Sequence, residues 1–524
     1  MIVRGSTLLV ALLASGAWAQ TTETKQYADG GVYEGQFLNG RQHGQGTYRL
    51  PNGYEYTGEW FEGEIRGEGT ARFPNGSVYV GTFAAGKPEG RGTITFADGG
   101  TYTGEWVDGK IQGAGVAVYA NGVRYEGQFQ NAMHHGRGVM TSPDGYVYDG
   151  DWVNGVKEGE GRITYADGST YEGQLVAGER EGRGRLTTPE GLLYVGDWVD
   201  GRIEGRGCFL RLAEPPPEGA PLPVSLEMTE AGCVASPAEG AALPRFELYE
   251  GAFVAGQREG EGRATYANGD RYEGGFLADQ RHGRGTFTGA DGLRYVGQWS
   301  EGRMEGEGEV TYPDGSVYVG TFVDGLADGQ GRIAYPDGST YEGQWRAGVI
   351  EGRGVATYAN GLVYEGDFVA GRNQGRGRMT YADGYVYEGE WAEGQRNGQG
   401  TATYPDGTTY VGGFRDGQRE GRGRIVMPDG FTYEGGWLDG EISGEGVAAY
   451  PNGDVYEGTF AEGRREGQGT MRYASGEVEA GEWRDGAFVT PAIAPAAPAA
   501  PAGEAAAPAP EPAPEPPAAS ASGG

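Results

Sequence analysis

The sequence predicts an all-β protein, an elongated array of antiparallel β-hairpins joined into one extended sheet. Two observations lead to this fold class. A tyrosine recurs every 23 residues from Tyr33 to Tyr194 and again from Tyr249 to Tyr456, which is typical of a repeat array whose units bury their apolar faces against their neighbours. Within each repeat, two runs of alternating residues are separated by glycine-rich turns, as expected for the two strands of a hairpin.

The segment from Tyr387 to Thr409 illustrates one repeat, and its residues define positions 1 to 23. Positions 1, 3 and 5 share one face of a first strand because side chains alternate along a strand. Positions 14, 16 and 18 give a second strand in the same way. Positions 19 to 21 are Pro-Asp-Gly, in which proline presets the first turn angle and glycine takes the positive φ that closes the turn.

Glycine recurs at positions 3, 12 and 14 of every full repeat. Glycine weakens a strand unless another group approaches its backbone closely. The aromatic rings at positions 1, 5 and 18 are the candidates for that approach, so we expect an aromatic ladder over glycines to form the core rather than a ligand-stacking surface. The tryptophans of this structural ladder, all at position 5, are Trp60, Trp106, Trp152, Trp198, Trp299, Trp345, Trp391, Trp437 and Trp483.

The run Tyr-Glu-Gly-Glu-Trp, followed by Gly-x-x-x-Gly-x-Gly and a closing Asp-Gly, resembles the MORN repeat family. The resemblance covers the chain from about Tyr33 to Gly486. It implies an elongated β-hairpin array that serves as a scaffold, a dimerisation module or a membrane-associated module, with phosphoinositide binding proposed for some members. The family also occurs fused to lipid kinases, but this sequence has no kinase segment.

The first 19 residues have the features of a secretory signal peptide. Arg4 supplies a basic start, a short apolar run extends from Leu8 to Leu13, and Ala17-Trp18-Ala19 is a small-x-small cleavage site. The apolar run is too short to span a bilayer. We therefore expect an exported protein, in the periplasm or cell envelope of a bacterium. The expected organisation is a signal peptide (1–19), a repeat array opening on a half repeat (27–212), a Pro-rich insertion (213–245), a second array with a degenerate cap (246–489) and a disordered Ala/Pro-rich tail (490–524).

The insertion and the two cysteines lie together. Tyr194 and Tyr249 are separated by one repeat plus about 32 residues, by the repeat period. Two interpretations are open: a loop on the binding face of the array, or a disordered linker that divides it. Cys208 and Cys233 are expected to form a disulfide that ties the insertion to the array, with two free thiols or a redox site as the alternatives.

The C-terminal part changes character twice. Glu479 replaces the tyrosine of the last unit, and a charged, truncated unit is typical of a cap that discourages edge pairing. From Pro491 to Gly524 the sequence is almost entirely Ala and Pro with Glu504, Glu511 and Glu515. Such a segment cannot build a core and is expected to form an extended, mostly polyproline II tail.

A second period is superimposed on the first. Position 5 alternates between tryptophan and mostly phenylalanine, and position 10 is mainly aliphatic in the tryptophan repeats. We hypothesise that the indole packs on the aliphatic side chain of its own hairpin, although duplication of a two-repeat ancestor would give the same alternation without contact. The phenylalanine and leucine repeats carry arginine at position 10 in five cases: Arg180, Arg258, Arg281, Arg419 and Arg465.

The net charge limits the classes of partner that the protein is expected to bind. The formal net charge is −32, which opposes nucleic-acid binding and unaided docking on anionic lipid. The five arginines form a candidate anion or lipid-headgroup edge, with paired or solvated loop arginines as the plainer interpretation. The histidines are too dispersed to share a metal, and neither a Walker loop nor a Gly-x-Ser-x-Gly elbow occurs. We therefore predict no catalytic residue, cofactor or metal site, apart from weak divalent-ion association with the acidic surface.

These observations favour a non-enzymatic scaffold that presents a long β surface to an envelope protein or to a second copy of itself, with the tail as a spacer. The alternative is a peripheral membrane module that binds phospholipid headgroups through the arginine edge. An enzyme is the third and least favoured interpretation.

Overall fold

The computed structural model describes residues 21–489, so the predicted signal peptide and the predicted tail lie outside the described residues. Within residues 21–489 the secondary structure consists of β-strands without a helix, and every strand pair is antiparallel, as in the first hairpin of the array. The all-β fold class is thereby confirmed. The described residues also contain no helix long and apolar enough to cross a membrane.

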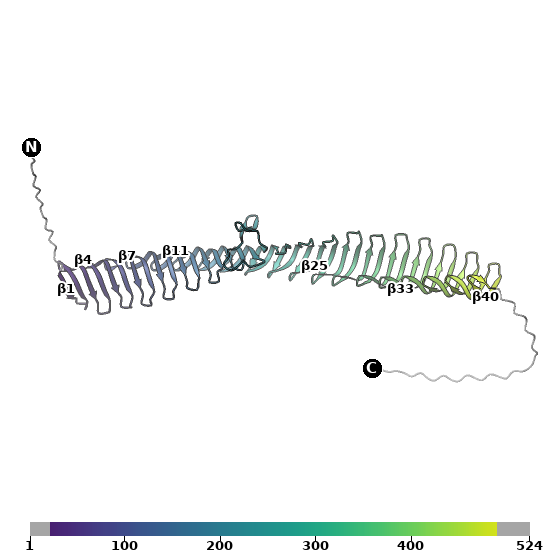
Figure 1. Cartoon of the computed structure of the whole chain (residues 1–524), viewed down its shortest axis with the longest axis horizontal. Helices are drawn as coiled ribbons and strands as arrows, with labels where there is room; N and C mark the ends of the chain where they lie inside the picture. Colours follow the sequence, from purple (N-terminus) through teal and green to yellow (C-terminus); the bar gives the residue numbers. More distant parts are fainter. Residues whose placement is uncertain (1–20, 490–524) are drawn as a thin grey trace, which may run out of the picture. The chain divides into compact units, whose positions relative to one another are not determined.

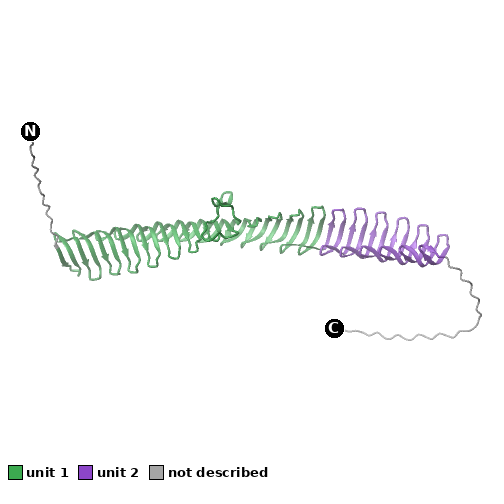
Figure 2. Ribbon diagram, viewed as in Figure 1, with its two compact units in different colours: residues 1–351 green, residues 352–524 purple. Residues whose placement is uncertain are grey.

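The chain divides into two compact units, residues 1–351 and residues 352–524 (Figure 2). The strands of the first unit are β1 (Thr21–Gln26), β2 (Val32–Leu38), β3 (Arg41–Arg49), β4 (Glu55–Phe61), β5 (Glu64–Arg72), β6 (Val78–Ala84), β7 (Lys87–Thr95), β8 (Thr101–Val107), β9 (Lys110–Val118), β10 (Arg124–Gln130), β11 (Met133–Thr141), β12 (Val147–Val153), β13 (Val156–Thr164), β14 (Thr170–Val176), β15 (Glu179–Thr187), β16 (Leu192–Val199), β17 (Arg202–Leu212), β18 (Val224–Thr229), β19 (Gly232–Pro237), β20 (Phe246–Val254), β21 (Gln257–Thr265), β22 (Arg271–Leu277), β23 (Gln280–Thr288), β24 (Arg294–Ser300), β25 (Arg303–Thr311), β26 (Val317–Val323), β27 (Leu326–Ala334) and β28 (Thr340–Arg346).

Strand β29 (Val349–Thr357) contains the boundary between the units. The strands of the second unit are β30 (Val363–Val369), β31 (Arg372–Thr380), β32 (Val386–Ala392), β33 (Gln395–Thr403), β34 (Thr409–Arg415), β35 (Gln418–Val426), β36 (Thr432–Leu438), β37 (Glu441–Ala449), β38 (Val455–Ala461), β39 (Arg464–Arg472), β40 (Val478–Arg484) and β41 (Ala487–Phe488).

Apart from β18 and β19, strands that follow each other in sequence lie side by side within each unit (Figure 1). The register is the same from repeat to repeat: position 1 faces position 16 of its own hairpin, and position 3 faces position 14, as Tyr295 faces Val310 and Gly297 faces Gly308. The array begins at Thr21, before the predicted boundary at residue 27, because β1 pairs with β2. This strand has no apolar alternation, so the sequence pattern did not reveal it.

Two turn types connect the strands. Positions 7 and 8 both have positive φ, for example Asp324 at 52° and Gly325 at 84°, which is the two-residue turn that matches the twist of a hairpin. The other turn is closed by glycine at position 21, such as Gly315 with φ 88°. Glycine is needed at position 12 for a different reason, which is a β-bulge. Gly306 has φ 64° and lies opposite the register shift between Gly297 and Gln298. The prediction that an aromatic ring approaches position 12 is therefore wrong, since the side chain of Gln298 lies there.

The insertion is folded. Strands β18 and β19 form a separate two-stranded hairpin that projects from the array (Figure 1), while β17 pairs directly with β20 beneath it. The interpretation of the insertion as a disordered linker is therefore wrong. The array continues across the insertion because positions 12 to 19 of the repeat before it pair with the repeat after it.

Candidate binding groove

The aromatic face of the sheet carries the side chains of positions 1 and 5. Tyr295 is buried at position 1, and its hydroxyl donates a hydrogen bond of 2.8 Å to the carbonyl of Gln298. A Cβ atom on Gly308, at position 14, would lie 2.6 Å from Oη and 2.7 Å from Cζ of Tyr295. Protein interiors are close-packed, so the ring cannot move aside to relieve that overlap. Positions 3 and 14 must therefore be glycine because the tyrosine ring occupies the space of a side chain.

Each tyrosine also joins two position-5 rings. The ring centroid of Tyr295 is 5.1 Å from that of Trp299 in its own repeat and 5.3 Å from that of Phe322 in the next, both edge to face. This geometry is favourable for aromatic pairs. Burial raises the pKa of Tyr295 to about 12, since the charged phenolate is poorly solvated there. The ladder is thus the continuous core that ties one repeat to the next.

The structure places all nine predicted tryptophans in this buried ladder. Each indole Nε1 donates to the carbonyl of position 14 in the preceding repeat, as Trp299 does to Gly285 at 3.3 Å. Phenylalanine at position 5 lacks this donor. The nine residues are Trp60, Trp106, Trp152, Trp198, Trp299, Trp345, Trp391, Trp437 and Trp483.

The five arginines of the predicted anion edge lie against the same ladder. Four of them place the guanidinium carbon 4.1 to 4.4 Å from the ring centroid of the tryptophan in the next repeat, a cation–π arrangement. Each also donates to the carbonyl of position 8 in that repeat, as Arg281 does to Gly302 at 2.7 Å. The four are Arg180, Arg281, Arg419 and Arg465.

Arg258 is the fifth, and phenylalanine follows it instead of tryptophan. Its guanidinium carbon is 5.5 Å from the ring centroid of Phe276, and it forms ion pairs with Glu247 at 3.5 Å and Asp279 at 3.2 Å. The guanidinium groups of all five arginines are therefore in contact with other residues of the array, between one repeat and the next.

The alternation of the sequence has a structural basis in these contacts. An arginine at position 10 of a phenylalanine or leucine repeat packs on the tryptophan of the following repeat, as Arg281 packs on Trp299. In tryptophan repeats an aliphatic residue at position 10 is the register partner of the indole, as Met304 is of Trp299. Trp198, Trp299 and Trp437 thus each have an aliphatic register partner in their own hairpin and a cation from the hairpin before it.

His134 takes the place of the arginine in one repeat. Its ring stacks on Tyr125 with 3.7 Å between centroids and meets Trp152 edge to face at 4.8 Å. Its Nε2 is 2.7 Å from the hydroxyl of Tyr119. Burial lowers the pKa of His134 to about 4, so the imidazole is neutral at pH 7 and acts as an aromatic part of the ladder.

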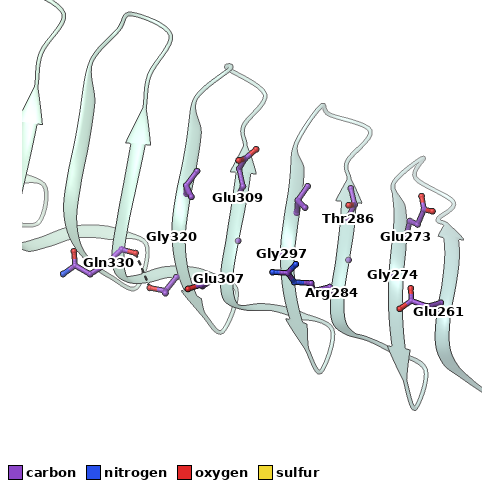
Figure 3. Close-up of a pocket in the computed structure, with 15 residues that line it drawn as sticks. Glu261, Glu273, Gly274, Arg284, Thr286, Gly297, Glu307, Glu309, Gly320 and Gln330 are labelled. Carbon is purple, nitrogen blue, oxygen red and sulfur yellow. Dashed lines mark hydrogen bonds between the residues drawn. The ribbon is translucent and has the colours of Figure 1, made fainter.

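The opposite side, the groove face, carries positions 2, 4, 13 and 15. Between these rows lies the backbone of positions 3 and 14, which is half-buried or buried and sends no side chain into the space between the rows, because the side-chain direction is taken by the tyrosines behind the sheet. The result is a groove that crosses the strands, with glycines along its floor (Figure 3). One wall consists of positions 2 and 15, including Glu273 and Thr286, and the other consists of positions 4 and 13, including Arg284 and Glu307. This feature is called the glycine groove below.

The glycine groove recurs at equivalent positions elsewhere in both units. In the first unit it is also hollowed around Gly92, Gly104 and Gly115. In the second unit it is hollowed around Gly377 and Gly389, and again around Gly446 and Gly458. A linear ligand lying in one such stretch would therefore meet the same floor at every repeat.

The wall charges differ between these stretches. The stretch of the first unit in Figure 3 has four glutamates and one arginine on its walls. In the second unit, Arg376 and Arg378 stand on the two walls of one repeat, and Arg422 and Arg424 do so two repeats later. The same two stretches also carry three glutamates each, which are Glu365, Glu388 and Glu390 in one and Glu434, Glu445 and Glu457 in the other. The groove is thus acidic around Gly297 and of mixed charge in the second unit.

The insertion hairpin lies on the groove face. Its Val224 and Leu226 form a buried apolar cluster with Cys208, Leu210 and Leu212 of β17. Cys208 occupies position 15 of its repeat, the position that forms one wall of the groove elsewhere, and it is bonded to Cys233 of β19. A short segment outside the repeats is therefore held on this face in the folded protein.

Apolar side chains are also exposed beyond the groove, at position 6. Five successive repeats of the first unit carry one there with an exposed fraction of 44 to 50%: Val153, Val176, Val199, Val254 and Leu277. Within residues 21–489, no group of three or more His, Cys, Asp or Glu side chains is arranged to hold a metal ion.

A family model of the MORN repeat matches eight segments between residues 33 and 211 and ten segments between residues 249 and 478. The chain belongs to the MORN repeat family. The matched segments follow the tyrosine period, and the insertion separates the two groups of MORN repeats. No curated protein matches the chain.

Several solved structures share a weak likeness with this MORN-repeat protein. The wild-type TCP10 domain of CPAP from Danio rerio is 15% identical with a TM-score of 0.24, and the match covers 42% of this chain and 99% of that one. The SAS-4 (dCPAP) TCP domain of Drosophila melanogaster, in complex with a proline-rich motif of Ana2, is 15% identical with a TM-score of 0.19, covering 38% of this chain and 88% of that one. Likenesses this distant support no functional inference.

Sequence reasoning missed the glycine groove. It predicted the two strands of each hairpin but did not identify the furrow between positions 2 and 4 on the face opposite the aromatic rings. The signal was present in the spacing, because a hairpin that pairs position 3 with position 14 places glycine opposite glycine in every repeat. It also missed that the position-10 arginine reaches the next repeat.

Proposed function

We propose that this MORN-repeat protein is a non-enzymatic scaffold of the bacterial cell envelope that binds an extended polypeptide in the glycine groove. The observation that carries the proposal is that the two faces of the sheet differ in packing. All the position-1 tyrosines with their position-5 partners are packed on the aromatic face, whereas the groove face repeats one open, polar-walled floor. An extended ligand can make the same backbone-level contact many times over, which suits a repeat scaffold.

The export signal supports the location, and a disulfide between Cys208 and Cys233 suits an oxidising compartment. Fractionation of cells that express the full chain tests this part. Recovery of the protein in the periplasmic or envelope fraction, cleaved after residue 19, is expected. Recovery of uncleaved chain in the cytoplasm would contradict it.

The binding role is tested by retention of envelope proteins on the immobilised chain. Val296→Arg with Val319→Arg places two long side chains on the groove wall, at residues that are 37% and 51% exposed, so the fold is expected to be unaffected. Leu277→Arg with Val323→Arg, at the exposed position 6, is the matched control. Proteins that bind the groove should be retained by the wild type and the control but lost from the groove variant. Equal retention by all three would refute groove binding.

The membrane alternative has less support. A headgroup-binding edge needs accessible positive groups, but the five position-10 arginines contact aromatic rings, and all five donate to backbone carbonyls. Flotation with anionic vesicles tests it directly. Salt-sensitive binding that disappears when the five arginines become alanine would favour the membrane interpretation over the scaffold.

A further inference from the structure

The array begins and ends on two incomplete repeats that are complementary. Residues 21–32 carry positions 12 to 23 of a repeat, and residues 479–489 carry positions 1 to 11. The tyrosine of position 1 is missing from residues 1–20, and Thr490 and Ala492 stand where positions 12 and 14 have glycine in complete repeats. The two half units together contain each position of one repeat once.

Each half unit has a strand with one unpaired side within residues 21–489. β1 pairs with β2 alone, and β40 pairs along its length with β39. On its other side, β40 meets β41 only at Trp483 and Arg484, and the amide of Val489 donates to the carbonyl of Glu482 at 2.8 Å. β1 and β40 lie at the outer ends of their units (Figure 1). In the described part of the chain, the outer side of Val478 to Gly481 is therefore free to pair with a further strand.

The internal hairpins define the register in which that strand would pair. Position 1 faces position 16, position 2 faces position 15 and position 3 faces position 14, as in β2 and β3. β1 of a second copy carries positions 14 to 17 as Glu23 to Gln26. Placed beside β40, it sets four pairs: Val478 with Gln26, Glu479 with Lys25, Ala480 with Thr24, and Gly481 with Glu23.

The two edges have opposite charges at the pair that replaces the tyrosine. Lys25 lies on the aromatic face because it is opposite Tyr33, and Glu479 lies on the same face because it is opposite Met471. Directly opposed residues have Cβ atoms ~4.5–5.5 Å apart, so the ammonium and the carboxylate can form an ion pair across the junction. The hydroxyl of Tyr473 donates to one oxygen of Glu479 at 2.5 Å, and a carboxylate can accept further hydrogen bonds on its other oxygen.

The remaining charges at the junction are farther apart. Glu23 would be the diagonal neighbour of Glu479, at ~7–8 Å, so this repulsion is weaker than the attraction of the directly opposed pair. The net charge of −32 on each copy opposes approach from a distance. At 0.15 M salt the Debye length is ~8 Å, so contacts at the junction outweigh that long-range repulsion.

The glycine pattern agrees with the same pairing. In complete repeats position 14 is glycine because the ring of the position-1 tyrosine takes the space of a side chain, as Tyr295 does at Gly308. Glu479 has no ring, and the residue that would complete its unit at position 14 is Glu23. The exception at position 1 and the exception at position 14 therefore fit each other.

The junction would also restore a hydrogen bond between hairpin loops. Gly63, at position 8, donates a 2.9 Å hydrogen bond to the carbonyl of Gln42 at position 10 of the preceding repeat. Gly40 is position 8 of the first complete repeat, and among residues 21–489 its amide has no such partner. With β1 beside β40 of another copy, Phe488 of that copy would be the position-10 residue before Gly40.

We propose that copies of this chain associate head to tail, with β40 of one copy paired antiparallel with β1 of the next, so that two half units complete one repeat. Such a contact is heterologous, so the product keeps one free β1 edge and one free β40 edge to which further copies add. The interface is small, so association is reversible and depends on concentration. The glycine groove continues across the junction, with Ala480 and Thr24 on one wall. This goes beyond the proposed function and does not depend on what the groove binds.

Two symmetric pairings are the competing arrangements. Pairing of two β40 strands brings two copies of Glu479 close together, which is unfavourable. Pairing of two β1 strands about Thr24 sets Glu23 opposite Lys25, so charge permits it. However, it places two second strands side by side, whereas each second strand of the array lies between two first strands, as β25 lies between β24 and β26.

Cysteine cross-linking of the full chain distinguishes the three pairings. One variant carries Thr24→Cys and another carries Ala480→Cys, both at exposed side chains, and the native cysteines are bonded to each other. With a short bismaleimide, a covalent dimer is expected from the mixture and not from either variant alone. No dimer from the mixture would overturn the proposal. An equal yield from Thr24→Cys alone, or from Ala480→Cys alone, would also overturn it in favour of a symmetric pairing.

The matched control for cross-linking mixes Thr47→Cys with Ala480→Cys. Thr47 occupies position 15 of the first complete repeat, two strands or about 9.6 Å farther from the junction than Thr24. Its yield should be about tenfold lower, because the linker does not span the added distance. Equal yields from the two mixtures would show random collision and refute the pairing.

Charge exchange tests the register by sedimentation velocity. Lys25→Glu and Glu479→Lys should each raise the dissociation constant about fivefold, since an attraction becomes a repulsion. Both changes in one chain should restore association. Lys110→Glu, at an exposed lysine of the first unit, alters the net charge equally and should have no effect. An equal effect of Lys25→Glu and Lys110→Glu, or no restoration in the double variant, would refute the register. The Val296→Arg and Val319→Arg variant should still associate, so a failure of groove binding and a failure of assembly are distinguishable.

Discussion

Replacing one glycine of the floor tests whether the tyrosine ring determines the repeat. In Gly308→Ala, the new methyl group would lie 2.6 Å from Oη and 2.7 Å from Cζ of Tyr295, about 1 Å inside normal contact between such atoms. Gly308 does not have positive φ, so the backbone itself accepts alanine. The cost comes from displacing a fully buried ring. Overpacking costs ~1–3 kcal/mol and loss of a large aromatic from a core ~3–5 kcal/mol, so we expect about 3 kcal/mol.

The assay must resolve one repeat in a long array. Each repeat contacts only its neighbours, so global unfolding does not report a local change faithfully. Amide hydrogen exchange measured by mass spectrometry reports local opening. A loss of about 3 kcal/mol corresponds to about a 100-fold fall in protection in β24 to β26. Protection in distant strands such as β4 should not change.

Gly302→Ala in the same repeat is the matched control. Gly302 has φ 79° and open space around its Cβ direction, so alanine there meets only backbone strain of ~1–2 kcal/mol. We expect a smaller fall in protection than for Gly308→Ala. If the two variants lose equal protection, or if Gly308→Ala loses less, the ring does not determine the glycine and the explanation of the core is refuted.

Three further predictions follow from the contacts. In a double-mutant cycle, Arg281→Met and Trp299→Phe should show a coupling of about 1 kcal/mol in local exchange, because the cation–π pair is removed by either change; additive effects would contradict it. Buried position-1 tyrosines such as Tyr33, whose pKa is raised to about 12, favour the folded state fully below the unfolded pKa of ~10 and lose that contribution as pH rises to about 12. Far-UV circular dichroism should therefore show unfolding in this pH range, and an intact sheet at pH 12 would refute the assignment. Cys208→Ser with Cys233→Ser should cost the insertion ~3 kcal/mol by the loop-closure model and open it to proteolysis, while β17 stays paired with β20; protease cleavage within the repeats themselves would be the contrary result.

The mutual dependence of positions 1, 3 and 14 explains why the period of 23 residues is so strict. A tyrosine needs two glycines beneath it, and those glycines lie on two strands that must stay in register, as Gly297 and Gly308 do. An insertion within a hairpin would shift one glycine away from the ring. The chain accommodates its one insertion after position 19, where β17 has already completed its pairing with β20.

The sequence by itself determined the hairpin, the register of its turns and the identity of the core. Alternation places positions 1, 3 and 5 on one face, and turn glycines limit where the strands end, so local chemistry is sufficient. It also identified the position-5 tryptophans and the cysteine pair as structural elements. It did not assign position 12 correctly, because a glycine required by positive φ and a glycine required by close approach look alike in a sequence.

Only the tertiary structure showed which side chains contact each other between repeats and what shape the groove face has. The distance from Arg281 to Trp299 depends on how one hairpin is laid against the next, and the periodicity alone does not give that. The glycine groove exists because the ring of each tyrosine occupies one side of the glycine backbone and leaves the other side open. Residue spacing specifies which side chains share a face, but the space between those faces follows from packing in three dimensions.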